Sequence, residues 1–218
     1  MPHDIGLTGQ LQEYCHHYFL NEPPVLQSLR VQTRRMPEGH MQVTPLQGQL
    51  LGFLVKMTQA KKILEVGTYT GYSSLAMALS LPPQSQIITC DRNSEWTKVA
   101  QKYWKMAGVD HKITLMLGSA TETLEKLIDQ QQSFDLILID ADKKNYETYL
   151  GQSLSLLRST GIILVDNVLW AGKVTENDPK DLTLTRIQEF NEKTSKDERI
   201  EKCLLPIGDG MLLIRKKD

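Results

Sequence analysis

Polar side chains that can bind a ligand follow directly after two apolar runs of this chain, residues 134–139 and 161–165. Short runs rich in Ile and Leu are typical of strands buried on both faces, as in a parallel sheet. Ligands of open α/β sheets bind outside the carboxyl ends of such strands. The first run leads into Asp140 and the second into Asp166 and Asn167. We therefore expect these three side chains to meet at a ligand-binding edge.

A glycine-bearing segment, residues 62–74, offers a second candidate site, because an apolar run leads through Glu65, Gly67 and Gly71 into a helical pattern. Glycine lets the backbone approach a ligand closely. The spacing Gly-x-x-x-Gly differs from the Gly-x-Gly-x-x-Gly that binds a pyrophosphate, and the Glu65 carboxylate would repel a phosphate. The segment favours a ligand with a positive charge, a hydroxyl or an amine, although an ordinary tight turn would use the same glycines.

Asp91 ends the next apolar run, residues 86–90. An acid at this position commonly binds ribose hydroxyls in nucleotide-binding α/β folds. The alternative is that Asp91 caps the following helix. Its place after the glycine segment favours the ribose contact.

Regular alternation of strand and helix patterns must position these residues. Thr44, Pro45 and Gln47 form a capping box that predicts a helix to about residue 57. Further elements are expected as helices at 96–107, 119–127 with Ser119 as N-cap, and 181–196, a strand at 113–118, and a hairpin around Gly208-Asp209-Gly210. Residues 1–40 are helical in pattern. The alternation predicts an α/β fold with a mostly parallel sheet that one antiparallel strand joins.

Composition excludes several classes of function. A chain of 218 residues suits one α/β domain, and a net charge of −1 offers no field that would attract a nucleic acid. Three scattered cysteines indicate neither a disulfide framework nor a zinc site, which favours a reducing cytoplasm. We expect a soluble protein, because no run approaches the roughly 18 apolar residues of a membrane span and no secretion signal is evident.

Taken in order, the motifs resemble the class I S-adenosylmethionine-dependent methyltransferases, and within them the cation-dependent caffeoyl-CoA and catechol O-methyltransferases. The resemblance spans about residues 40–218. It rests on Leu64-Glu-Val-Gly-Thr-Tyr-Thr-Gly-Tyr-Ser73, Ala107-Gly-Val-Asp-His-Lys-Ile113, Asp140-Ala-Asp-Lys143, Asp166-Asn-Val-Leu-Trp170 and Leu205-Pro-Ile-Gly-Asp-Gly210. It implies a Rossmann-like methyltransferase fold over residues 1–218, with a seven-stranded sheet, an antiparallel last strand and helices on both faces. It also implies a homodimer, with residues 1–40 near the acceptor pocket and the dimer interface.

The resemblance further implies a role for individual residues. S-adenosylmethionine would be bound by Val43, Glu65, Gly67, Thr68, Ser73, Asp91, Ala120, Asp140 and Asp142. A divalent cation would be bound by Asp140, Asp166 and Asn167, and Lys143 would be the general base. Ala171 stands where the plant enzymes have an Asn that touches the acceptor, which argues against caffeoyl-CoA itself as the acceptor.

This set of residues is chemically consistent with methyl transfer to an oxygen. Two carboxylates and an amide suit Mg²⁺, with Mn²⁺ or Ca²⁺ as alternatives. Such a cation lowers the cost of ionising a phenol, and two vicinal hydroxyls would chelate it. We therefore expect a small catechol-like aromatic acceptor. Lys143 can accept a proton only as the neutral amine, and its alternative is a surface charge or a salt bridge to Asp142. Trp170 either lines the acceptor pocket or packs in the core.

Competing interpretations remain open at this point. A nicotinamide-dependent dehydrogenase could use a related sheet, although Glu65 and the glycine spacing argue against it. A catalytically idle cofactor-binding or scaffold protein would not need both Lys143 and the acids. An RNA methyltransferase would be expected to have a basic aromatic cluster, which this sequence lacks.

Overall fold

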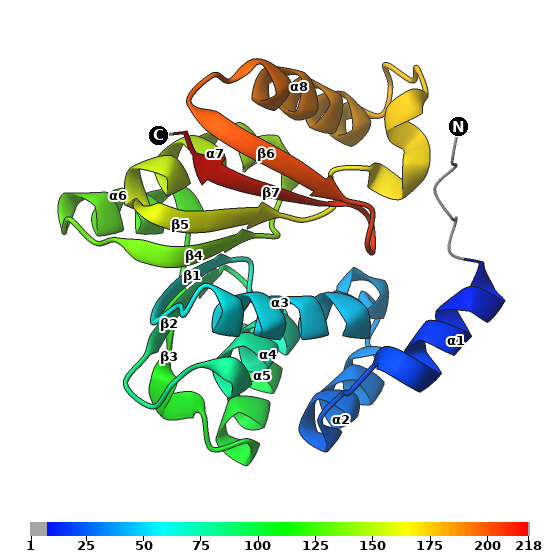
Figure 1. Ribbon diagram of the computed structural model, residues 1–218, viewed down its shortest axis with the longest axis vertical. Coiled ribbons are helices and arrows are strands. Elements are labelled where there is room, and N and C mark those ends of the chain that lie inside the picture. Colours follow the sequence, from blue (N-terminus) through cyan, green and yellow to red (C-terminus); the bar gives the residue numbers. More distant parts are fainter. Residues whose placement is uncertain (1–7, 218) are drawn as a thin grey trace.

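The computed structural model describes residues 8–217 and shows helices on both sides of one sheet (Figure 1). The sheet has the strand order β3-β2-β1-β4-β5-β7-β6. The strands are β1 Lys62–Val66, β2 Gln86–Asp91, β3 Ile113–Leu117, β4 Phe134–Ile139, β5 Leu157–Val165, β6 Ile200–Leu205 and β7 Met211–Lys216. Strands β1 to β5 pair in parallel, and β7 runs antiparallel to both β5 and β6. The predicted seven-stranded sheet with an antiparallel last strand is confirmed.

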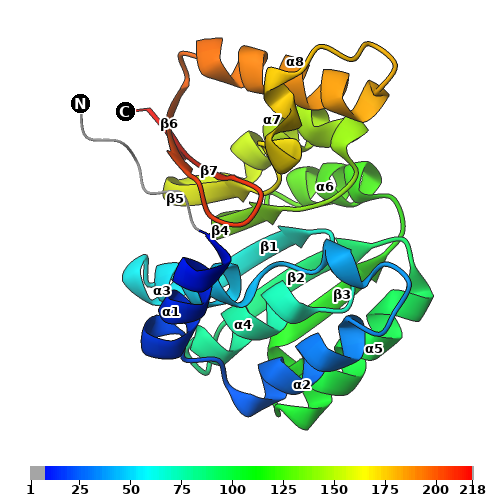
Figure 2. The ribbon, with the colours of Figure 1, turned by 90° about the vertical axis from the view of Figure 1, so that its right-hand side faces the viewer.

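Two helix layers cover the sheet, and the side view separates them (Figure 2). The helices are α1 Gly9–Phe19, α2 Pro24–Thr33, α3 Pro45–Met57, α4 Tyr72–Ser80, α5 Ser94–Met106, α6 Ala120–Asp129, α7 Tyr146–Leu156 and α8 Leu182–Lys196. Residues of α2 to α5 pack with Leu136 in one apolar cluster, and residues of α6 to α8 pack with Ile137 in the other. Adjacent strand residues point to opposite faces, which explains why these two neighbours divide between the clusters. No helix within residues 8–217 is long and apolar enough to cross a membrane.

Capping side chains explain where α3 and α5 begin. The Thr44 hydroxyl accepts a hydrogen bond from the Gln47 amide, and the Gln47 side chain accepts one from the Thr44 amide, which confirms the capping box. Asn93 accepts hydrogen bonds from the amides of Glu95 and Trp96, so α5 begins at Ser94 and earlier than predicted. Residues 8–40 are largely helical, as expected, while residues 1–7 of that prediction lie outside the described part of the chain.

Three local predictions need correction. Ser119 is the N-cap residue of α6, as predicted, but its hydroxyl bonds to the Thr121 hydroxyl and not to a backbone amide. Residues 146–156, to which no helix was assigned, form α7, and their buried side chains at Tyr146, Tyr149 and Leu150 do show helical spacing. Strand β5 begins at Leu157, before the expected residue 161.

The strand order reverses between β1 and β4, and their carboxyl ends meet the cavity described below. The Asp140 amide donates a hydrogen bond to the Val66 carbonyl at 2.8 Å, which ties the two ends together. Gly67 has φ +101°, and a Cβ atom there would overlap the Asp140 carbonyl oxygen. Glycine is therefore required at 67 for β4 to deliver Asp140 to this point.

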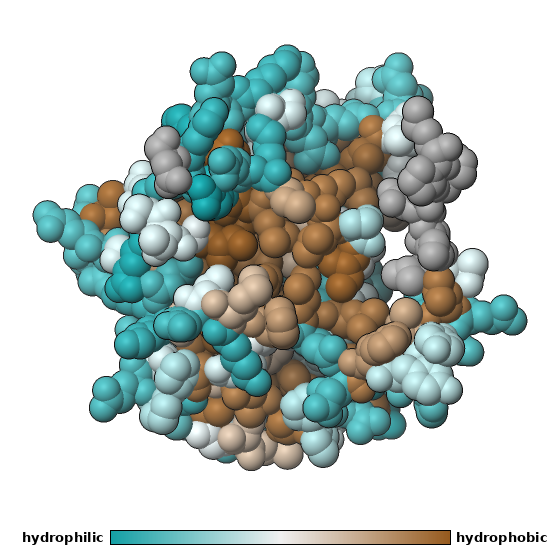
Figure 3. Space-filling view, viewed as in Figure 1, coloured by the Kyte–Doolittle hydropathy of each residue, from teal (hydrophilic) through white to brown (hydrophobic). Residues whose placement is uncertain are grey.

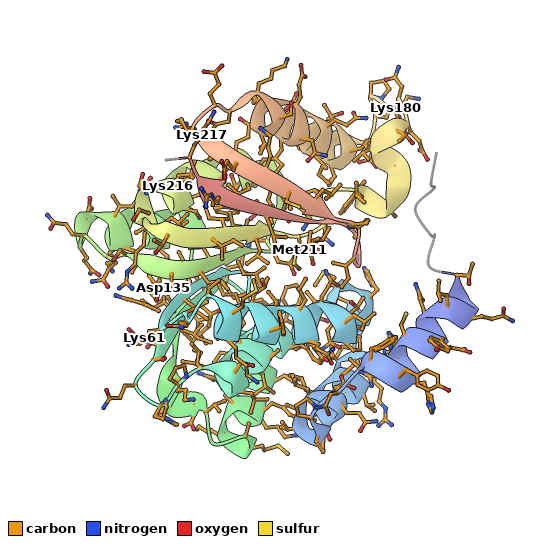
Figure 4. All side chains as sticks on the ribbon, viewed as in Figure 1. Lys61, Asp135, Lys180, Met211, Lys216 and Lys217 are labelled. Carbon is orange, nitrogen blue, oxygen red and sulfur yellow. The ribbon has the colours of Figure 1, made fainter. Side chains whose placement is uncertain are left out.

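At the opposite end of these strands, charged residues serve the structure. Figure 4 shows Lys61 beside Asp135, far from Met211 at the start of β7. The Asp135 carboxylate accepts hydrogen bonds from the amides of Lys61 at 2.9 Å and Lys62 at 2.8 Å, and it pairs with Arg158. These contacts fix the amino ends of β1 and β4, so the carboxyl ends are the place to look for ligand chemistry.

Candidate functional site

A cavity of about 1620 Å³ opens at the carboxyl ends of the parallel strands. Its wall contains every predicted site residue except Glu65, namely Val43, Gly67, Thr68, Ser73, Asp91, Ala120, Asp140, Asp142, Lys143, Asp166 and Asn167. The start of α3 and residues 206–209 of the β6–β7 turn also line it, and so do Gln12, His16, Arg34 and His40 of the N-terminal segment, which was expected near the acceptor. Pockets for one small molecule usually measure roughly 300–1000 Å³. The cavity therefore has room for two ligands side by side.

Glu65 lies behind this wall and not in it. Its side chain is fully buried, and its carboxylate accepts hydrogen bonds from the hydroxyls of Ser73 and Thr89, both at 2.5 Å. Desolvation raises the pKa of Glu65 to about 7, although both hydroxyls lower it. Glu65 thus orients Ser73, which does line the cavity, and a direct contact of Glu65 with a cofactor stays a prediction.

This buried carboxyl makes the stability of the fold depend on pH. The pKa of Glu65 is higher in the folded chain than its ordinary value of 4.5, so the protonated carboxyl contributes its full stability to the fold below about pH 4.5. This contribution, roughly 3 kcal/mol in the free energy of unfolding, is lost as the pH rises through about 7. Urea unfolding of the wild type and of Glu65→Gln at pH 5 and pH 8 measures the loss. We expect Glu65→Gln to unfold at relatively higher urea at pH 8. An equal difference between the two proteins at both pH values would contradict this account.

Asp91 closes the glycine loop. Its Oδ2 atom accepts hydrogen bonds from the amides of Thr68 at 3.1 Å and Tyr69 at 2.7 Å, and its Oδ1 atom accepts one from the Asn93 amide at 2.8 Å. Because Asn93 is the N-cap of α5, the alternative role of Asp91 as that cap is wrong. Asp91 also lines the cavity, so its contact with ribose hydroxyls stays a prediction that the geometry permits.

The residues that follow β4 and β5 meet as the sequence predicts. The Oδ1 atom of buried Asp166 accepts hydrogen bonds from the Asn167 amide at 2.8 Å and from the Gln47 side chain at 2.9 Å. The Lys143 Nζ atom donates to Asn167 Oδ1 at 2.7 Å and lies 3.5 Å from Asp140 Oδ1. The structure therefore brings Asp140, Lys143, Asp166 and Asn167 into one cluster.

The electrostatics of this cluster favour a positive charge. Burial raises the pKa of Asp166 above its ordinary range, and the negative charge of Asp140 raises it further. The Asn167 amide, Lys143 and Gln47 act in the opposite direction. Two neighbouring carboxylates with limited solvation are stabilised by a cation between them. The Lys143 nitrogen lies beside one of them, Asp140, and its side chain is only 12% exposed.

The side chains of Asp140, Asp166 and Asn167 offer the type of oxygen that a hard divalent cation binds. Two carboxylates and one amide give an all-oxygen ligand set, which suits Mg²⁺. Within residues 8–217, no three His, Cys, Asp or Glu side chains form a metal-binding group. The Asn167 amide would therefore have to act as the third protein ligand beside Asp140 and Asp166, with water or substrate oxygens as the others.

Asp142 takes partners other than Lys143. Its carboxylate accepts hydrogen bonds from the Tyr149 hydroxyl at 2.7 Å and the Asn145 amide group at 2.6 Å, and Arg92 lies 3.6 Å from it. Lys143 pairs with Asp140 instead. The alternatives for Lys143, a surface charge or a salt bridge to Asp142, are thus wrong.

Trp170 and Ala171 form part of the cavity wall, in the turn that follows β5. Both have positive φ values, +47° and +53°. The Ala171 amide donates a hydrogen bond to Asp209 at 2.5 Å, which joins this turn to the β6–β7 hairpin. Of the two interpretations of Trp170, its half-buried place in the wall favours a pocket role over core packing.

A comparison with known families decides what kind of protein has this cavity. The model of a family described as O-methyltransferase matches residues 16–217. This chain belongs to the O-methyltransferase family. The protein is therefore an enzyme, and the family favours methyl transfer over the hydride transfer of the dehydrogenase that the sequence left open.

Relatives of this O-methyltransferase include two with informative names. This chain is 39% identical to catechol O-methyltransferase domain-containing protein 1 of Mus musculus, over 94% of this chain and 79% of that protein. It is also 37% identical to the caffeoyl-CoA O-methyltransferase of Medicago sativa, over 98% of this chain and 93% of that protein. Among solved structures, SAH-bound PaMTH1 of Podospora anserina matches with a TM-score of 0.90 at 28% identity over the whole of both chains. TomG of Streptomyces achromogenes, in complex with SAM, matches with a TM-score of 0.86 at 28% identity over 96% of both chains.

Sequence reasoning missed three side chains that hold the site of this O-methyltransferase in place: Gln47, Tyr146 and Tyr149. Gln47 was assigned only to the capping box, and its bond to Asp166 has no local signal because 119 positions separate the two. Tyr146 and Tyr149 bond to Lys143 and Asp142 respectively. Their signal was a pair of tyrosines at helical spacing directly after the Asp140–Lys143 motif.

Proposed function

We propose that the chain transfers the methyl group of S-adenosylmethionine to one hydroxyl of a small, vicinal dihydroxy aromatic acceptor, with a divalent cation, Mg²⁺ in the first place. The observation that carries the proposal is the cluster of Asp140, Lys143, Asp166 and Asn167 in the wall of one cavity that also contains the glycine loop. The metal and the methyl donor would thus share one chamber with the acceptor.

The methyl donor would occupy the side of the cavity next to the glycine loop. The solved relatives in complex with SAH and with SAM support this ligand. Gly67, Thr68 and Ser73 would contact the methionine part, and Asp91 the ribose. Val43, Ala120, Asp140 and Asp142 would complete the binding surface, with Glu65 in support of Ser73.

The acceptor would bind where the acids meet. A divalent cation held by Asp140, Asp166 and Asn167 would supply Lewis-acid stabilisation of a phenolic oxygen. The protein aligns that oxygen with the sulfonium methyl, and Lys143 as the neutral amine accepts the phenolic proton. The O–CH₃ bond forms as the S–CH₃ bond breaks, so the sulfonium leaves as the neutral thioether. The relatives named for caffeoyl-CoA and catechol support an acceptor of this class.

The proposed reaction is tested with the purified chain, S-adenosylmethionine, MgCl₂ and a panel of catechols, with product mass as the readout. We expect a gain of one methyl group on vicinal diols and loss of turnover in EDTA, restored by excess Mg²⁺. Monohydroxy analogues of the same catechols are the matched controls and should react far more slowly. Turnover that is unchanged in EDTA would contradict the metal, and product from no catechol would contradict the acceptor class.

We also propose that the chain forms a homodimer. Figure 3 shows hydrophobic side chains gathered over β6, β7 and α3. Phe53 and Met57, one turn apart on α3, are each 63% exposed, and Leu204 of β6 is 45% exposed. A second copy that packs against α3 and β6 would bury them. Sedimentation equilibrium should give twice the 24.8 kDa chain mass, and a monomer mass at micromolar concentration would contradict the proposal.

A further inference from the structure

We propose that Tyr146 is a positioning residue that holds the Lys143 amine in place for proton transfer. This inference rests on the proposed function, in which Lys143 accepts the phenolic proton. Tyr146 opens α7, directly after the turn that carries Lys143. Its hydroxyl lies 2.5 Å from the Lys143 Nζ atom and 3.0 Å from the Asp166 backbone carbonyl oxygen.

The direction of the hydrogen bonds makes Tyr146 an acceptor for Lys143. A phenol has a single O–H donor, and Tyr146 gives it to the Asp166 carbonyl. The lone pairs of the oxygen are then free to accept a hydrogen bond from the Lys143 nitrogen. The Tyr146 hydroxyl thus links Lys143 on one side of the cluster to the backbone of Asp166 on the other.

The tyrosine ring is tightly packed. Tyr146 is 1% exposed and packs edge to face against Phe190 of α8, with ring centroids 5.4 Å apart. The hydroxyl is therefore a fixed point, whereas the long Lys143 side chain has many rotamers of its own. A fixed acceptor at the end of a flexible side chain restricts where its nitrogen can lie.

The other hydrogen-bond partners of Lys143 explain why the contact with the Tyr146 hydroxyl is needed. The Lys143 nitrogen faces three acceptors: Tyr146, Asn167 at 2.7 Å and Asp140 at 3.5 Å. Asp140 and Asn167 are also proposed ligands of the divalent cation, so their oxygens would then be turned to the metal. Of the three acceptors, Tyr146 is the one that the metal site does not use.

A double-mutant cycle between Tyr146→Phe and Lys143→Met tests the coupling. We expect Tyr146→Phe alone to lower kcat about 10- to 100-fold, because the amine is no longer held at the reacting oxygen. The affinity for S-adenosylhomocysteine, measured by calorimetry, should stay within about 3-fold. In the Lys143→Met background the same change should lower kcat by less than about 3-fold. A crystal structure of Tyr146→Phe should show the Lys143 nitrogen displaced.

Tyr149→Phe is the matched control, since it removes a hydroxyl from the same helix that bonds to Asp142 and not to Lys143. It should weaken S-adenosylhomocysteine binding more than it lowers kcat. Thermal unfolding is measured for each variant to check that it is folded. The inference is overturned if folded Tyr146→Phe keeps full kcat with Lys143 unmoved, or if its loss is equal in both backgrounds. Wild-type turnover of Lys143→Met would instead overturn the proposed role of Lys143, on which the inference depends.

Discussion

Replacement of Asp166 by Ala is expected to lower Mg²⁺-dependent turnover on the order of 1000-fold, or about 4 kcal/mol in activation free energy. Asp166 is 2% exposed, and its Oδ1 atom accepts hydrogen bonds from the Gln47 side chain and the Asn167 amide, so the alanine removes a proposed metal ligand that these two donors hold in place. Initial rates over a MgCl₂ titration measure the loss. The affinity for S-adenosylhomocysteine should change little, because Asp166 is assigned to the metal and not to the methyl donor.

Two further variants show whether the loss in Asp166→Ala comes from the missing metal ligand. Asp166→Asn keeps the shape and one oxygen but removes the charge, so it should need far more Mg²⁺ and recover part of the rate at saturation. Asp129→Asn, an exposed change at the end of α6, should behave as the wild type. If Asp166→Ala retains normal turnover and the same Mg²⁺ dependence, the metal assignment is wrong.

Replacement of Lys143 by Met is expected to lower kcat by about 100- to 10,000-fold, the usual range for loss of a general base. Lys143 lies within hydrogen-bonding distance of Asn167 and close to Asp140, so its nitrogen is next to the proposed metal ligands. The variant should still bind S-adenosylhomocysteine, measured by calorimetry, and should still require a divalent cation. The measurement is kcat under saturating methyl donor, Mg²⁺ and acceptor.

The Lys143→Arg variant distinguishes two possible roles of Lys143, as a positive charge and as a proton acceptor. An arginine keeps the positive charge near Asp140 but does not give up a proton near neutral pH, so it cannot then accept one. We expect it to be nearly as slow as Lys143→Met. Lys126→Met is the matched control, since this lysine is exposed on α6 and is not part of the cavity wall, and its kcat should stay within about 3-fold of the wild type. Full activity of Lys143→Arg would show that only the charge matters.

Much of the architecture was predictable because its signals are local. The apolar runs before Asp140 and Asp166 indicated buried parallel strands, and a parallel sheet places all such strand ends at one edge. The capping box at Thr44 and Gln47 was also readable, since the cap involves residues only three positions apart. Some local errors concern side chains with two available partners of similar strength. The Ser119 hydroxyl, for example, bonds to the Thr121 hydroxyl and not to a backbone amide.

The contacts that tune the site were not predictable in this way. The Gln47 side chain donates a hydrogen bond to Asp166, and the Asp91 carboxylate accepts hydrogen bonds from the loop amides of Thr68 and Tyr69. The partners in each pair are far apart in the sequence, so no local pattern predicts these contacts. The burial that raises the pKa of Glu65 likewise depends on β1, β2 and α4 packing together around it.

The sequence by itself determined which residue types would stand at the carboxyl edge, because the order of strands and polar residues is written along the chain. Only the tertiary structure decided how these residues pair: that Lys143 faces Asp140 and not Asp142, and that Tyr146 joins Lys143 to the Asp166 backbone. The physical reason is that strand ends are positioned by backbone pairing, whereas side-chain partners depend on the packing of α3, α7 and α8 against the sheet.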